Sequence, residues 1–125
     1  MSTVYEYAVL RVVPSIERGE AMNVGTVVYC RGLDFLGCRT HLDEARLLVL
    51  SPGLDLDGVR AALHAIDAVC CGGDQAGQAS SVSPGQRFRW LTAPRSAIVQ
   101  PGPVHAGLTA DPATELDRLH HLLVH

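Results

Sequence analysis

The chain has 125 residues, of which 47% are hydrophobic and 18% charged, so a wholly disordered chain is excluded and a single domain over residues 1–125 is expected. The formal net charge of −3 argues against non-specific nucleic-acid binding. All ten basic residues are arginines, which excludes any mechanism that needs a lysine of this chain.

The N-terminal third predicts three strands. Residues 3–13 alternate with apolar side chains on both faces, as in an interior strand, and Pro14 is expected to end it. Residues 23–31 and 35–41 are predicted as an antiparallel hairpin around the tight turn at 31–34. No basic leader and no apolar run of about 20 residues is found, so a cytoplasmic protein outside the membrane is expected.

Two helices are predicted next. Residues 43–49 form a short helix that Ser51-Pro52-Gly53 stops. Asp55 is a suitable N-cap for a longer helix that runs to about Cys71. Its apolar residues fall on one stripe at helical spacing: Val59, Ala62, Leu63, Ile66, Val69 and Cys70.

The C-terminal half begins with residues 72–86, a predicted mobile surface loop. Residues 87–91 alternate, and as a strand they would direct Phe88 and Trp90 inward. A further strand is expected at 96–100. The last helix starts with Asp111 as N-cap and Pro112 at the first helical position, and a leucine stripe follows.

These elements indicate an α+β fold. We expect an antiparallel sheet of four or five strands, with two or three helices packed on one face. The segment 88–112 returns to the sheet, and its Pro- and Gly-rich connections form the most promising candidate site.

Arg95 and Ser96 suggest an anion clamp, because a guanidinium and a hydroxyl beside exposed backbone N–H groups hold phosphate or carboxylate. The alternative is that Arg95 ties the loop down through backbone carbonyls or Asp111. His105 is a candidate general base with Asp111 as its orienting partner, although a loop histidine is more often structural. Trp90 is assigned to the core rather than to a stacking platform for a base.

Asn23 and Gly25 open the second strand, and Gly25 would allow close approach of a ligand or of Arg95. Bulge or turn chemistry is the preferred interpretation, with Glu20 as a possible partner of a loop arginine. No metal site or cofactor is expected. Zinc binding would require four side chains to converge: Cys30, Cys38, His41 and Cys70. The simpler explanation is that the cysteines are ordinary buried thiols.

Three segments carry a family resemblance: YEYAVLRVVP, GEAMNVGTVVYC, and FRWLTAPRSAIVQPGPVHAGLTADP followed by the leucine-rich helix. Across essentially its whole length the chain resembles the bacterial "domain of unknown function 3037" (DUF3037) family of high-GC actinobacteria. The activity of this family is not established, so the resemblance assigns no catalytic role to any residue. It implies a protein partner, since similar proteins are often encoded beside a HipA-like, kinase-fold protein. The matching positions are Asn23, Gly25, Trp90, Pro94, Arg95, Ser96, His105, Gly107, Asp111 and Pro112.

Three functions are therefore considered. The preferred one is a small non-catalytic accessory module that binds a partner protein, and homo-oligomerisation is also open. The alternative is an enzyme or sensor for a small anionic or nucleotide ligand, which requires Arg95, His105 and Asp111 to share a pocket. Nucleic-acid binding through Arg87, Arg89 and Arg95 is disfavoured by the acidic balance.

Overall fold

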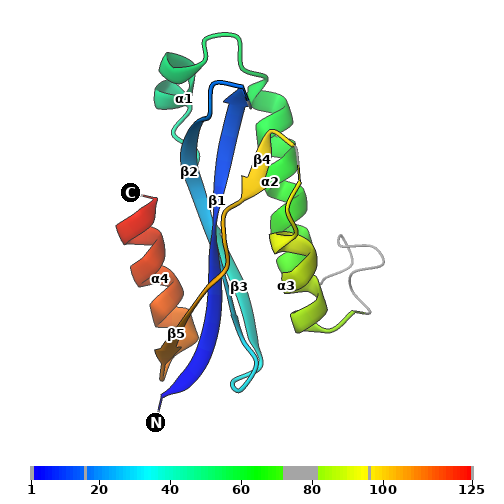
Figure 1. The fold of residues 1–125 in the computed structure, drawn as a ribbon, viewed down its shortest axis with the longest axis vertical. Helices are drawn as coiled ribbons and strands as arrows, with labels where there is room; N and C mark the ends of the chain where they lie inside the picture. Colours follow the sequence, from blue (N-terminus) through cyan, green and yellow to red (C-terminus); the bar gives the residue numbers. More distant parts are fainter. Residues whose placement is uncertain (1, 16, 72–81, 96, 125) are drawn as a thin grey trace.

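A long strand, β1 (Thr3–Ser15), forms the centre of a five-stranded antiparallel sheet (Figure 1). The computed structural model describes residues 2–15, 17–71, 82–95 and 97–124. On one side of β1 lie β2 (Glu20–Cys30) and then β3 (Phe35–Thr40). On the other side β4 (Val99–Pro101) and β5 (His105–Thr109) pair with successive parts of β1. The predicted antiparallel α+β fold is confirmed.

The predicted turn at 31–34 joins β2 to β3, and the Asp34 N–H donates to the Arg31 carbonyl at 3.2 Å. Strand β1 does not end at Pro14 as predicted but runs to Ser15. The register shifts between Val12 and Ser15, so Pro14 lies at an irregular point of the ladder, where its missing N–H is tolerated.

Four helices complete the fold, rather than two or three. They are α1 (Glu44–Leu50), α2 (Leu56–Cys71), α3 (Pro84–Thr92) and α4 (Pro112–Leu123). Local capping sets their starts, because a side-chain oxygen accepts from an otherwise unpaired N–H of the first turn. Asp55 accepts from the Gly58 N–H at 3.0 Å, and Asp111 from the Ala113 and Thr114 N–H groups, so both predicted N-caps are confirmed.

The helices cover both faces of the sheet, which differs from the expected one-sided packing. Adjacent strand residues point to opposite faces. Val27 lies in the cluster with α2 and α3, whereas Val28 lies in the cluster with Leu116 and Leu119 of α4. We call these the α2 face and the α4 face. The interior strands are apolar on both sides, so each face needs its own cover.

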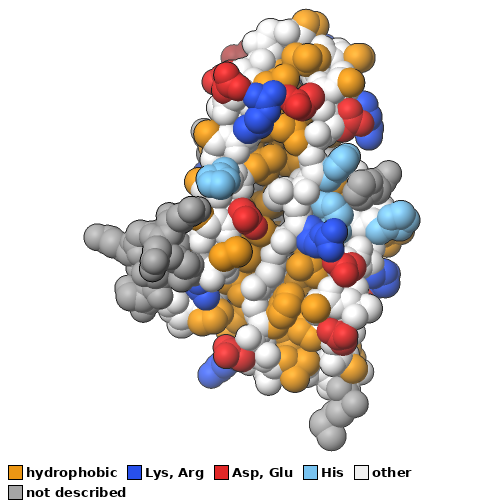
Figure 2. Space-filling view, turned by 180° about the vertical axis from the view of Figure 1, so that it is seen from behind, with side chains coloured by type: hydrophobic (Ala, Val, Ile, Leu, Met, Phe, Trp, Pro, Cys, Tyr) orange, Lys and Arg blue, Asp and Glu red, His pale blue; other side chains and the backbone are white. Residues whose placement is uncertain are grey.

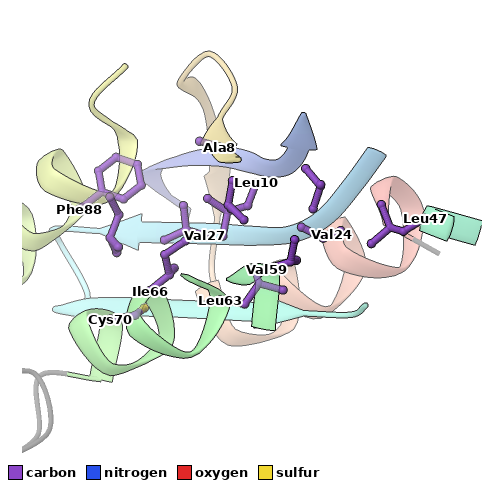
Figure 3. Close-up of a cluster of buried hydrophobic side chains, with 13 residues drawn as sticks. Ala8, Leu10, Val24, Val27, Leu47, Val59, Leu63, Ile66, Cys70 and Phe88 are labelled. Carbon is purple, nitrogen blue, oxygen red and sulfur yellow. The ribbon is translucent and has the colours of Figure 1, made fainter. Parts of the chain in front are cut away.

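The larger core lies on the α2 face. Leu10 and Val27 of the sheet meet Leu63 and Ile66 of α2 and Phe88 of α3, as Figure 3 shows. Phe88 is fully buried, and its ring stacks on Tyr29 with the centroids 5.4 Å apart. This core fixes α2 and α3 side by side on the sheet.

The predicted strand at 87–91 is wrong, because these residues lie in α3. Phe88 is buried as expected, but its inward partner is Leu91, three residues on, and Trp90 is 43% exposed. Ser83 caps the helix by accepting from the Gln86 N–H, and Pro84 occupies its first turn. An alternation of only five residues is too short to distinguish a strand from a helix. The N-cap at Ser83 is the local signal for a helix here.

The rest of the C-terminal half differs in detail from the prediction. The expected loop at 72–86 falls largely on residues 72–81, which lie outside the described residues, and its last positions belong to α3. The strand expected at 96–100 is β4, at 99–101. His105 lies in a strand, β5, that was not predicted. In the described part of the chain no helix combines the length and apolarity needed to cross a membrane.

Tyr5 anchors β1 to α4 through a buried polar network. Its hydroxyl donates to Glu115, which also pairs with Arg118 at 2.7 Å. Burial, reinforced by the bond to Glu115, raises the pKa of Tyr5 to about 12.

In a pH titration followed by tyrosinate absorbance, we expect Tyr5 to ionise only as the pH approaches about 12. A raised pKa means that the associated stabilisation is complete below the ordinary value of 10.0 and is lost as the pH rises towards about 12. In Tyr5→Phe this transition should vanish. Its survival in that variant would contradict the network.

Candidate functional site

An apolar groove of about 280 Å³ opens on the α2 face, between α2, α3 and the chain entering β4. The small side chains of Ala62 and Ala65 on α2 leave this space open. The lining residues are Ala62, Ala65, Ile66, Val69, Trp90, Leu91, Arg95, Ala97, Ile98 and Val99. The groove brings together two of the predicted site residues, Trp90 and Arg95.

Trp90 lies on the outer side of α3 and is 43% exposed, so its assignment to the core is wrong. The α2 residues that line the groove with Trp90 are all apolar. An exposed tryptophan next to an apolar groove offers a large contact area at low entropic cost.

Arg95 closes the end of α3. Its guanidinium donates to the Trp90 carbonyl and, at 3.4 Å, to the Ala93 carbonyl. These bonds satisfy carbonyls that the helix end leaves unpaired. Arg95 therefore ties the loop down through backbone carbonyls, which was the alternative to an anion clamp. Its side chain is still exposed at the rim of the groove. Ser96, its predicted partner, lies outside the described residues.

His105 and Asp111 do not form the expected acid–base pair. The His105 ring packs on Tyr7 of β1, with the ring centroids 5.2 Å apart, on the α4 face. The Asp111 carboxylate accepts from Ala113 and Thr114 of its own helix, and these bonds, led by the Thr114 hydroxyl, lower the pKa of Asp111. Arg95 lines the groove on the α2 face, so the sheet separates its side chain from that of His105.

Asn23 and Gly25 flank a β-bulge in β2. Leu10 pairs with Gly25 and Arg11 with Asn23, so Val24 is an extra residue without a partner on β1. The bulge turns Asn23 to the α4 face, where its amide donates to the Leu123 carbonyl at 3.0 Å. Gly25 is buried against β3. Both residues fit the preferred bulge interpretation, and Glu20 pairs with Arg18 rather than with Arg95.

The arginines proposed for nucleic-acid binding are engaged within the fold. Arg87 donates to the Val69 carbonyl at 3.4 Å, and Arg89 forms a two-bond ion pair with Glu6 at 2.8 and 2.9 Å. Figure 2 shows the side opposite to Figure 1, where basic side chains stand mostly beside acidic ones and hydrophobic side chains run between them. This face does not provide a basic stripe for phosphates.

The sheet separates Cys30 from Cys38 and Cys70. Cys30 lies on the α4 face and contacts the Val4 carbonyl, whereas Cys38 lies on the α2 face beside Asp67 and Cys70. The contact with Cys70, together with burial, raises the pKa of Cys38, so its thiol stays protonated and is a poor nucleophile. Within the described residues no group of potential ligands can hold a metal ion.

Sequence reasoning missed two features. The alanine side of α2 that forms the groove has no sequence signal beyond a high alanine content. Arg11 was grouped with its apolar strand, although a charge at the centre of an interior strand is itself a signal.

Comparison with known proteins gives a family but no activity. A family model described as "Protein of unknown function (DUF3037)" matches residues 7–124. No curated protein and no solved structure matches the chain.

Proposed function

The chain belongs to the DUF3037 family over nearly its whole length. Because membership of this family assigns no reaction, we propose from the features of the molecular surface that the protein is a small non-catalytic module that binds a partner protein. The groove beside Trp90 carries this proposal. Tryptophan and arginine are the residues most enriched at energetically dominant interface positions, and here both border one apolar depression.

The proposed partner inserts an apolar side chain into the groove and covers the exposed indole of Trp90. Arg95 keeps guanidinium N–H groups at the rim, where an acidic residue of the partner would be accepted. The first partner to test is a HipA-like, kinase-fold protein of the same host, which the family resemblance implies.

Trp90→Ala is expected to weaken the complex with that HipA-like protein by about 30-fold or more, the loss that corresponds to about 2 kcal/mol for a dominant contact. Isothermal titration calorimetry with both purified proteins measures it. Leu122→Ala is the matched control, because Leu122 is also an exposed apolar residue, 65% exposed, but belongs to α4 on the other side of the sheet.

The titrations test separately whether the groove is the interface and whether the HipA-like protein is the partner. Equal weakening by both variants, or by Leu122→Ala alone, would contradict the groove as the interface. No complex with the wild-type protein at about 100 μM would contradict the HipA-like protein as its partner, since specific complexes bind well below this concentration.

A further inference from the structure

Three polar side chains form a row across the α4 face of the sheet. Arg11 of β1 pairs in register with Asn23 of β2 on one side and with Gln100 of β4 on the other. Directly opposed residues of antiparallel strands have Cβ atoms about 4.5–5.5 Å apart, so the three side chains are neighbours.

The guanidinium of Arg11 has no partner in the described part of the chain. Five other arginines form ion pairs with carboxylates, but Arg11 forms none, and its Nε is buried without a hydrogen-bond acceptor. A buried donor left unpaired is costly, and the cost rises for a charged group. Such a cation is expected where a ligand supplies the missing anion.

The site around Arg11 is open. Val9 and Val13, its neighbours on the α4 face, are partly exposed, whereas Leu10 and Val12 on the α2 face are fully buried. The difference arises because α4 packs mainly on β2 and β3 and reaches β1 at Tyr5, which leaves the part of β1 that pairs with β4 less covered (Figure 1).

Gly102 makes room for the guanidinium. A Cβ at this position would collide with Nη2 and would lie 3.1 Å from Cζ of Arg11. The Gly102 N–H still donates to the Val9 carbonyl at 2.7 Å, so the chain stays bonded to β1 one residue beyond the end of β4. The glycine of the Pro-Gly-Pro segment thus seats Arg11 at the break between β4 and β5.

We propose that Arg11 binds the carboxylate of a small organic ligand, with the Gln100 amide donating a further hydrogen bond and Val9 and Val13 contacting the apolar part of the molecule. A guanidinium matches a carboxylate with two parallel hydrogen bonds. The row supplies a single positive charge, which balances a monoanion but leaves a phosphate dianion half compensated. This site is separate from the groove beside Trp90, since it lies on the other face of the sheet.

The test is an NMR titration of the arginine Nε–Hε resonances with acetate, hexanoate and inorganic phosphate at constant ionic strength. The Arg11 resonance should shift saturably with hexanoate, about fourfold more tightly than with acetate if roughly one methylene becomes buried. Because Arg11→Met removes the reporting resonance, binding to this variant is followed at the Gln100 side-chain amide, whose saturable shift with hexanoate should be abolished. Arg18→Met is the matched control and should leave it unchanged, because Arg18 is exposed and already paired with Glu20 at 2.6 Å.

Gln100→Leu provides a second variant that keeps the charge, and it should weaken hexanoate binding by about 3- to 10-fold through the lost hydrogen bond. Non-saturating shifts of equal size at all arginines would overturn the site. Tighter binding of phosphate than of hexanoate would overturn the assignment of a carboxylate ligand.

Discussion

Phe88→Ala is expected to lower the free energy of unfolding by about 3–5 kcal/mol, the range for truncating a buried aromatic residue. Phe88 is fully buried on the α2 face and stacks on Tyr29, so the truncation removes the contact between α3 and β2 and leaves a cavity. Urea denaturation followed by far-ultraviolet circular dichroism measures the loss. In a domain whose total stability is about 5–15 kcal/mol, this is a large fraction.

Trp90→Ala is the matched control on the same helix. Because Trp90 is 43% exposed, its truncation should cost about 1–2 kcal/mol, clearly less than that of Phe88. Equal losses for the two variants would instead support a strand with both aromatics inward. The pair of measurements therefore tests the helical period of residues 84–92 as well as the packing of Phe88.

The sequence was sufficient to predict those elements whose position depends on residues that are close together in the chain. Asp55 and Asp111 were identified as N-caps because their carboxylates satisfy N–H groups two or three residues on, which needs no tertiary context. The alternation of residues 3–13 likewise predicted β1, since the apolar residues on both faces required an interior position in the sheet.

Nonlocal pairing could not be predicted. Gly25 indicated a bulge in β2, but nothing near Asn23 in the chain encodes that the bulge at Val24 pairs Asn23 with Arg11. His105 and Asp111 are close in sequence, but β5 directs the histidine onto Tyr7 while the aspartate caps α4. Trp90 and Arg95 come together because residues five apart at a helix end lie close in space, although the strand prediction for 87–91 had assigned Trp90 to the core.

Gly25→Ala is expected to lower the free energy of unfolding by about 1–3 kcal/mol, the usual penalty for overpacking. The added Cβ would lie 2.9 Å from the Arg39 carbonyl oxygen and 3.2 Å from a methyl group of Leu10. The first of these atoms belongs to the backbone of β3, which cannot rotate away as a side chain can. Thermal and urea unfolding of the purified variant measure the effect.

Gly53→Ala is the control, because a Cβ there meets nothing within 4 Å and the backbone is not in the left-handed region. It should leave stability unchanged or raise it by up to about 1 kcal/mol through a less flexible unfolded chain. The effect of Gly25→Ala on the free energy of unfolding distinguishes a structural role of Gly25 from a role in ligand binding. If Gly25 served only the close approach of a ligand, Gly25→Ala would fold with wild-type stability and lose binding alone, whereas the crowding of β3 against the bulge requires that stability itself falls.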